Sequence, residues 1–291
     1  MNNNLKIIGD CYKKFGLKHT SKSTATLPHS MRFFKKHCLT PKEANSLSNA
    51  ALYGGTILHM IVQEVLTKNL SLDDVIKSEL IQTKIAEYDP FNEKDKLKFK
   101  FIIENAKETA QNHLKNIQEL PKQKWEDEAE RTIWTPPVQT YWLLFIDLVG
   151  ETDFGDLKNK FGRVTKTKKK GYSYSAVKMP DRPFFSDILQ ISLYRKACPL
   201  KPFLSYASHT DRKLFTEENC EDLKKDNLDK HLKKLMIYEI AWQKKLEVAD
   251  GDINKLAWLC PPDYSDIKKN SFWFEGVPKE YIKRYLDYYA V

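Results

Sequence analysis

Two aspartates and one lysine within residues 141–160 have the types and spacing of a site for divalent-metal chemistry. Asp147 ends an apolar run, and Asp156 and Lys158 follow after a polar turn. Carboxylate oxygens are the ligands that Mg²⁺ prefers in proteins. A lysine beside the cation could orient a water molecule and stabilise negative charge on a phosphate. The residue types therefore indicate phosphodiester chemistry.

A β-hairpin is the element that would bring these side chains together. An apolar strand ends at Asp147, and Gly150–Asp153 supplies a turn signal before the second strand. Because side chains alternate along a strand, Asp156 and Lys158 share one face. Leu157 then points to the other face, toward the core.

Four other acidic side chains are alternative candidates for the metal ligands. Glu151 and Asp153 belong to the turn itself, and residues at a hairpin tip face water by default. Glu128 and Glu130 lie in a predicted strand over 125–134 and could approach the site. Acidic clusters are more often solvated faces, so we expect the metal ligands elsewhere.

A histidine on an upstream helix is a further candidate ligand. The spacing of apolar side chains over 55–68 predicts an amphipathic helix, whose stripe contains Leu58, Ile61, Val62, Val65 and Leu66. His59 lies at the edge of this stripe, between Gly55 and Gln63 on the same side of the helix. Such a histidine is more often a boundary residue than a ligand, and both interpretations remain open.

A downstream helix adds two polar side chains. Residues 184–197 have a helical pattern, and Gln190 and Tyr194 stand one turn apart on its same side. For Tyr194 the simpler interpretation is a ring packed on the sheet. A strand over 201–208 follows, and 213–215 could pair with it.

In this order the motifs resemble the PD-(D/E)XK nuclease superfamily, specifically its RecB-like branch. That branch includes many phage exonucleases, CRISPR-associated RecB-type nucleases and the mitochondrial genome maintenance exonuclease. The resemblance covers roughly residues 59–194. The matching motifs are the G-x-x-x-H helix at Gly55–His59, the first acidic residue Asp147, the D-x-K signature Asp156-Leu157-Lys158, and the Q-x-x-x-Y helix at Gln190–Tyr194.

The resemblance implies a metal-dependent DNA exonuclease, similar to phage enzymes, that uses Mg²⁺ or Mn²⁺ and acts on single- or double-stranded DNA with ends. A histidine nitrogen among the ligands would favour Mn²⁺. The implied metal ligands are His59, Asp147, Asp156 and the carbonyl of Leu157. The implied catalytic residues are Asp147, Asp156, Lys158, Gln190 and Tyr194.

The sequence departs from the RecB-like pattern before the first aspartate and in the compact turn between Asp147 and Asp156, which makes Glu151 and Asp153 rival carboxylates. Residues 143–146 are Leu, Leu, Phe and Ile, where the family usually has a glycine shortly before the first aspartate. The cluster-binding cysteines of some relatives are missing. Five cysteines without a C-x-x-C spacing predict free thiols, no disulfide framework and no iron–sulfur cluster.

The net charge of +9 is compatible with a polyanionic partner. Residues 161–183 interleave basic and aromatic side chains without a regular period, which indicates a mobile loop or ribbon. Such a composition suits phosphate contacts and base stacking, although a merely solvated loop is nearly as well supported. The candidate DNA-binding residues are Arg163, Lys166, Lys168, Lys169, Lys170, Tyr172 and Tyr174.

A basic segment over 28–38 predicts a short helix. Phe33 and Phe34 in it could dock on the core, which is the simpler interpretation. The alternative places Arg32, Lys35 and Lys36 on nucleic-acid phosphates.

For the fold, we expect an α/β protein with a small mixed central β-sheet flanked by helices, as in restriction endonucleases. A single domain over 1–291 is preferred, with a core at about 55–215 and helical additions at both ends. Helices are predicted over 71–84, 93–120 and 221–248.

No apolar stretch is long enough to span a bilayer, and the N-terminal residues lack a secretory signal, so we expect a cytoplasmic location. Two alternatives to an exonuclease remain. One is a structure-specific endonuclease of the same fold. The other is a non-catalytic nucleic-acid-binding recombination module.

Overall fold

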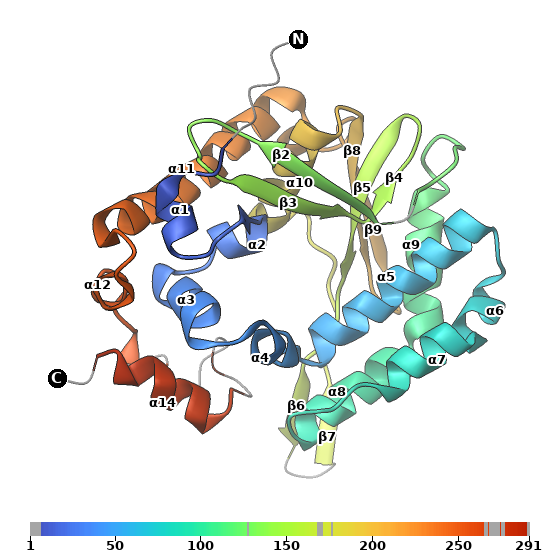
Figure 1. Ribbon diagram of the computed structural model, residues 1–291. Coiled ribbons are helices and arrows are strands. Elements are labelled where there is room, and N and C mark those ends of the chain that lie inside the picture. Colours follow the sequence, from blue (N-terminus) through green and yellow to red (C-terminus); the bar gives the residue numbers. More distant parts are fainter. Residues whose placement is uncertain are drawn as a thin grey trace. The chain divides into compact units, whose positions relative to one another are not determined.

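The computed structural model describes residues 7–126, 128–167, 171–175, 177–264, 267, 274 and 277–289, apart from the side chains of residues 45, 46 and 166 (Figure 1). The chain divides into two compact units. The first combines Met1–Leu47, Arg131–Leu144 and Lys230–Val291, and the second combines Ser48–Glu130 and Phe145–Asp229. The expected core at about 55–215 falls within the second unit, except for residues 131–144.

The second unit is built on a four-stranded mixed sheet. Its strands, in spatial order, are β4 (Leu148–Val149), β5 (Asp153–Asn159), β8 (Lys201–Ala207) and β9 (Arg212–Thr216). The β4–β5 and β8–β9 pairs are antiparallel, whereas β5 and β8 run parallel. The predicted α/β class with a small mixed sheet is confirmed, as are the two strands expected near residues 201–215.

Helices surround this sheet. They are α5 (Ala50–Lys68), α6 (Leu72–Lys77), α7 (Glu79–Ala86), α8 (Glu93–Glu104), α9 (Ala106–Ile117) and α10 (Phe185–Ala197). Each of the two long helices predicted over 71–84 and 93–120 is therefore broken in two. At one break, Ser78 ends α6 and its hydroxyl accepts a hydrogen bond from the main-chain nitrogen of Ile81 in the first turn of α7.

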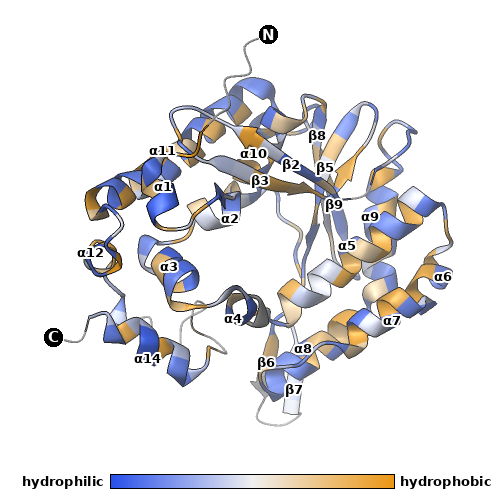
Figure 2. Cartoon of the chain, in the orientation of Figure 1, coloured by the Kyte–Doolittle hydropathy of each residue, from blue (hydrophilic) through white to orange (hydrophobic). Residues whose placement is uncertain are grey.

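The core of the second unit lies between α5 and the sheet. Ile61 and Val62 of α5 pack in one apolar cluster with Leu157 of β5 and Phe203 of β8, and Leu157 is buried as predicted. Each such side chain stabilises the fold by about 1.5–3 kcal/mol through burial. Bands of apolar and polar residues along α5, α7 and α8 show the amphipathic character of these helices (Figure 2).

Close packing also explains a glycine in β5. A Cβ atom on Gly155 would lie 2.5 Å from ring atoms of Phe203 on the neighbouring strand. No side chain fits there without moving that ring, so the glycine lets β5 and β8 approach at this register.

The expected hairpin has an interrupted first strand. β3 (Tyr141–Ile146) ends one residue before Asp147, the chain bends there, and β4 begins at Leu148. β3 pairs in a separate three-stranded sheet with β1 (His19–Thr20) and β2 (Ala129–Trp134). The hairpin turn itself forms between β4 and β5, as predicted.

The first unit is mostly helical. Its helices are α1 (Asp10–Lys14), α2 (Lys22–Ala25), α3 (His29–Phe33), a π-helix (Phe34–Cys38), α4 (Pro41–Ser46), α12 (Ile253–Trp258) and α14 (Lys279–Asp287). A short 3₁₀ turn (Glu221–Leu223) precedes α11 (Lys225–Ala249), so the helix predicted over 221–248 begins slightly later. In the described part of the chain, we find no helix with the length and hydropathy of a membrane span.

The basic segment over 28–38 has a structural role. Phe33 and Phe34 are fully buried, which confirms the docking interpretation. Arg32 is also buried, and its two Nη atoms donate to the Glu239 carboxylate at 2.6 and 2.7 Å. The guanidinium lies 4.5 Å from the centroid of the Trp242 ring. The alternative that placed Arg32 on a phosphate is therefore wrong, because the side chain is buried and both of its Nη atoms bind the Glu239 carboxylate.

Candidate active site

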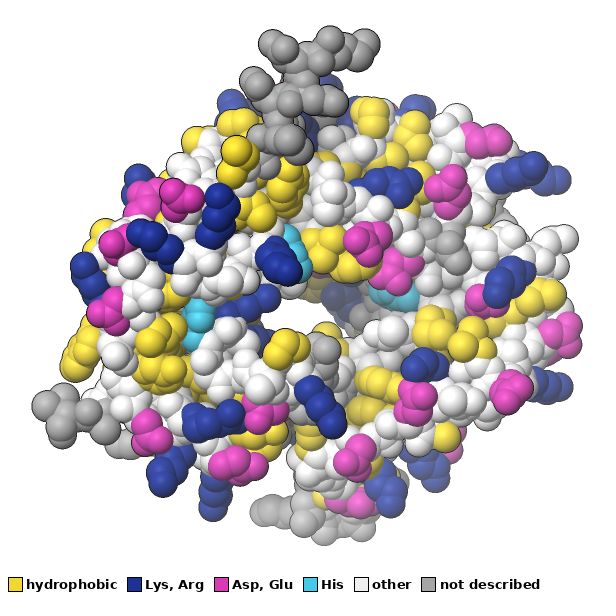
Figure 3. All heavy atoms as spheres, in the orientation of Figure 1, with side chains coloured by type: hydrophobic (Ala, Val, Ile, Leu, Met, Phe, Trp, Pro, Cys, Tyr) yellow, Lys and Arg dark blue, Asp and Glu magenta, His cyan; other side chains and the backbone are white. Residues whose placement is uncertain are grey.

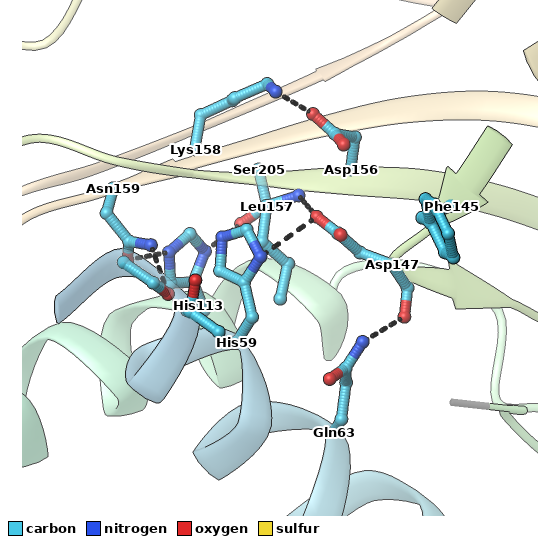
Figure 4. A network of polar contacts seen from close by, with 12 residues as sticks. His59, Gln63, His113, Phe145, Asp147, Asp156, Leu157, Lys158, Asn159 and Ser205 are labelled. Carbon is cyan, nitrogen blue, oxygen red and sulfur yellow. Dashed lines mark hydrogen bonds and ion pairs between the residues drawn. The ribbon is translucent and has the colours of Figure 1, made fainter. Parts of the chain in front are cut away.

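Asp147 is held by residues of α5 on one side and by the main chain of β5 on the other (Figure 4). Its Oδ2 accepts a hydrogen bond of 2.7 Å from the main-chain nitrogen of Leu157 and lies 3.4 Å from His59 Nδ1. Its main-chain oxygen accepts a hydrogen bond of 2.8 Å from Gln63 Nε2. The structure thus brings His59 to Asp147.

Asp156 and Lys158 point to the same side of β5, as predicted from strand alternation. The Lys158 ammonium forms an ion pair with Asp156 Oδ2 and donates a hydrogen bond of 2.9 Å to Gln190 Oε1. Gln190 Nε2 donates in turn to Asp156 Oδ1 at 3.1 Å. One carboxamide on α10 therefore contacts both members of the D-x-K signature.

Tyr194 supports this arrangement from the next turn of α10. Its hydroxyl accepts a hydrogen bond from Gln190 Nε2 and donates one to the main-chain oxygen of Phe145. Burial raises the pKa of Tyr194, so the phenol keeps its proton at neutral pH. Its visible role is to fix the orientation of the Gln190 carboxamide.

Burial and neighbouring charges oppose each other in setting the pKa values of the site. Burial raises the pKa of Asp156 although Lys158 opposes this, and the nearby Asp147 carboxylate raises it further. Burial would lower the pKa of Lys158, but the carboxylates of Asp156, Asp187 and Asp147 outweigh it and raise the pKa. Lys158 therefore stays positively charged at neutral pH.

In the Asp147–His59 pair, the pKa of the carboxyl group is lowered and the pKa of the imidazole is raised. Burial would raise the pKa of Asp147, but the His59 ring lowers it overall. Burial would lower the pKa of His59, and the Asp147 carboxylate outweighs this and raises it. Each group stabilises the charged form of the other.

The donor set suits a hard divalent cation. Two buried carboxylates and one imidazole are oxygen and nitrogen ligands that Mg²⁺ and Mn²⁺ accept. Asp156 Oδ2 receives no hydrogen bond among the described residues, although the Lys158 ammonium lies against it. Within those residues, no three His, Cys, Asp or Glu side chains are gathered closely enough to form a ready metal site. The residue types fit a cation, while the side chains occupy a conformation in which they bind one another.

The turn residues differ from expectation. Glu151 is exposed as predicted, but Asp153 is the first residue of β5 and is buried. Its carboxylate accepts hydrogen bonds from Gln123 Nε2 at 2.9 Å and from the Thr152 hydroxyl. The expectation that Asp153 faces water is therefore wrong, because these two donors replace its hydration. Glu128 and Glu130 are exposed.

The predicted basic ribbon is a two-stranded hairpin of β6 (Val164–Thr167) and β7 (Gly171–Tyr174). Arg163 is exposed at its base, and Tyr172 is half-buried opposite residue 166. Tyr174 stacks on the Phe101 ring with centroids 3.9 Å apart, and its hydroxyl donates to the main-chain oxygen of Leu97. Tyr174 thus anchors the hairpin on α8.

None of the four candidate DNA-binding lysines has a described side chain. Lys168, Lys169 and Lys170 are outside the described residues, and of Lys166 only the main chain is described. Elsewhere, Lys and Arg side chains are scattered among Asp and Glu over the face seen in Figure 3. The surplus of basic residues by itself does not locate a binding surface on that face.

Sequence reasoning missed a buried polar network behind His59. The His113 ring lies between the Ser205 hydroxyl, 2.8 Å from Nδ1, and Asn159 Oδ1, 3.1 Å from Nε2. Asn159 Nδ2 donates to the main-chain oxygen of Gly55, so its oxygen faces His113 and Nε2 carries the donated proton. The network ties α9 and α5 to β5. No pattern in the sequence pointed to this network. For the neighbouring residue Gln63, the sequence showed only that it lies one helical turn from His59.

Comparison with known proteins gives limited further information. No known protein family matches the chain. No curated protein matches it either. Among solved structures, a presumed exonuclease from Eubacterium rectale is 14% identical, with a TM-score of 0.46 and 86% of each chain covered. The protein SSO0001 is also 14% identical, with a TM-score of 0.26, covering 62% of this chain and 73% of its own. Both TM-scores are low, so the interpretation of the site rests on its geometry.

Proposed function

We propose that this protein is a metal-dependent deoxyribonuclease of the PD-(D/E)XK type that hydrolyses phosphodiester bonds from DNA ends. The observation that carries the proposal is the position of Gln190, which contacts both Lys158 and Asp156. A carboxylate and a lysine from β5 meet a carboxamide from α10 here, in the chain order of the RecB-like motifs. The Asp147–His59 pair completes the set.

The ligands that would hold Mg²⁺ or Mn²⁺ are Asp147, Asp156, His59 and the Leu157 carbonyl. A divalent cation supplies positive charge against the scissile phosphate and lowers the pKa of a water molecule. Asp156 has a raised pKa caused first by burial, so a cation at its buried Oδ2 would relieve an unfavourable charge. This is a reason for these residues to bind a metal.

Lys158 has two roles in this proposal. It stays protonated, so it can stabilise negative charge as the phosphate is attacked and can donate a hydrogen bond to the attacking water. Gln190 fixes the direction of its ammonium, and Tyr194 fixes Gln190. The two α10 residues are therefore positioning residues for the lysine.

The test compares Asp156→Asn and Lys158→Met with the parent protein on end-labelled linear DNA, single- and double-stranded, with Mg²⁺ or Mn²⁺. Either change should lower the rate of digestion by about 100-fold or more. Lys84→Met is a matched control, since Lys84 forms an exposed pair with Glu87, and it should retain the parental rate. Parental activity in either site variant would refute the assignment. Efficient cutting of closed circular single-stranded DNA would identify an endonuclease instead.

A further inference from the structure

The face of β5 that carries Asp156 and Lys158 continues to Lys160. The main-chain nitrogen of Lys160 bonds to the Ala207 oxygen, so the extended pairing with β8 reaches this residue. Strand alternation then places Lys160 on the same side as Lys158, about 6.6 Å further along the chain. The ammonium groups of Lys158 and Lys160 therefore lie on the same face of the extended strand.

An exposed aromatic ring meets this second ammonium. Lys160 Nζ lies 3.8 Å from the centroid of the Phe184 ring and 5.0 Å from that of Tyr206. Phe184, at the start of α10, is 47% exposed, and the adjacent Phe185 is 45% exposed. Phe184 and the Lys160 ammonium thus form a surface that is both apolar and positively charged, and the exposed Phe185 is the next residue in the chain.

Three direct contacts connect Phe184 to the candidate site. Its main-chain nitrogen donates to the Tyr206 hydroxyl at 3.2 Å, and that hydroxyl donates to Asp187 Oδ2 at 2.6 Å. Asp187 Oδ1 lies 3.8 Å from Lys158 Nζ. All of these residues belong to the second unit, so the main chain of Phe184 is tied to the candidate site.

We propose that Lys160, Phe184 and Phe185 form a subsite that binds the unpaired end of a nucleic-acid strand next to the scissile phosphate. Lys160 contacts a neighbouring backbone phosphate, and the exposed face of Phe184 stacks on a base, with Phe185 beside it. This inference rests on the proposed function, because that function places the scissile phosphate at Lys158.

The chemistry favours a single strand over other occupants. An internal base of a duplex has both faces covered by its neighbours, whereas an unpaired base at the end of a strand can turn a face to an aromatic ring. The combination of stacking rings with a cation that follows the backbone is typical of single-strand binding. A purely apolar partner would leave the Lys160 ammonium desolvated, which is unfavourable.

The experiment measures binding without metal, so that no cleavage is needed. Single-stranded oligonucleotides with 2-aminopurine at either the 5′ or the 3′ end are titrated with protein in EDTA, and fluorescence quenching reports stacking. Phe184→Ala should weaken binding about 5- to 150-fold and abolish the quenching. Phe184→Trp should retain both. Lys160→Met should weaken binding and reduce the salt dependence by about one counterion.

Leu80→Ala is the control, because Leu80 is 45% exposed on α7 of the same unit. It should bind as the parent does. Parental affinity and quenching in Phe184→Ala, or absence of single-strand binding by the parent, would overturn the subsite. If the parent digests DNA and Phe184→Ala binds single strands as the parent does, the subsite is overturned and the proposed nuclease function stands. If Phe184→Ala abolishes the quenching but the parent protein digests no DNA, the three residues bind a single strand and the proposed nuclease function is rejected.

Discussion

Gln63 Nε2 donates a hydrogen bond of 2.8 Å to the main-chain oxygen of Asp147, one helical turn beyond the contact that His59 makes with the same residue. One face of α5 therefore fixes both the main chain and the side chain of Asp147. Asp147 lies at a bend outside β3 and β4, so strand pairing alone does not set its position.

Gln63→Leu should loosen Asp147 and lower both the affinity for Mn²⁺ and the rate of DNA digestion. Changes to residues that orient metal ligands typically cost 10- to 100-fold. Binding of Mn²⁺ measured by calorimetry, together with kcat and KM for DNA, checks this. The expected signature is a lower kcat with little change in KM. Gln82→Leu, which removes a similar 2.8 Å bond to the Ile76 oxygen on the surface, serves as control.

Stability should fall when the pH drops below about 6.5, partly because of His113. Burial, assisted by the nearby His59 charge, lowers the pKa of His113 to about 3. An unfolded histidine has a pKa near 6.5, so between these values the unfolded state binds a proton that the folded state does not. The contribution of neutral His113 to the free energy of unfolding is fully present above about pH 6.5. By pH 5 the free energy of unfolding has lost about 2 kcal/mol of this contribution.

Urea unfolding at pH 7.5 and pH 5 measures this loss in the parent and in His113→Gln. The variant cannot gain the proton in its unfolded state, so its loss between the two pH values should be smaller by about 2 kcal/mol. An identical pH dependence in both proteins would contradict the assignment.

Arg32→Met should destabilise the protein by about 3–5 kcal/mol, because it leaves the fully buried Glu239 carboxylate without its cation. Thermal and urea unfolding measure the loss, and Arg32→Met combined with Glu239→Leu should recover much of it. Lys14→Met is the control, since its pair with Asp250 is largely exposed and should contribute less than about 1 kcal/mol. A loss in Arg32→Met no larger than the control would show that the pair is not buried in solution.

Gly155→Ala should destabilise the protein by about 1–3 kcal/mol, because the added methyl group overlaps the Phe203 ring. Since Asp156 is the next residue, nuclease activity per folded molecule should fall too. Gly55→Ala provides the comparison for stability, because its Cβ would meet only Asn159 Nδ2 at 3.7 Å in the interior of α5. That change should stabilise the helix by up to about 1 kcal/mol. Equal unfolding midpoints for the two variants would argue against the packing described for β5.

The parts of the site that follow from local rules could be predicted from the sequence. Alternation along a strand placed Asp156 and Lys158 together and Leu157 in the core. The one-turn helical spacing aligned Gln190 with Tyr194. These rules depend only on residues close in the chain, so no knowledge of the tertiary structure was needed.

The parts that failed depend on partners remote in the sequence. Asp153 looked like a turn residue, and its burial depends on Gln123. A phosphate contact was the alternative interpretation for Arg32, and the partner that excludes it, Glu239, lies on α11. Likewise, Gln63 binds a main-chain oxygen, which no side-chain pattern reveals. A charged side chain in a basic segment cannot be assigned to solvent or to the interior until its counterion is known.

The parallel pairing of β5 with β8 has a consequence for the order of folding. The β4–β5 and β8–β9 hairpins are local and can form in microseconds, whereas joining them requires closure of the long segment that contains β6, β7 and α10. The Lys158–Gln190 contact requires closure of most of the same segment, because Gln190 lies on α10. During refolding, catalytic competence should therefore appear later than strand content, as one of the last properties the chain acquires.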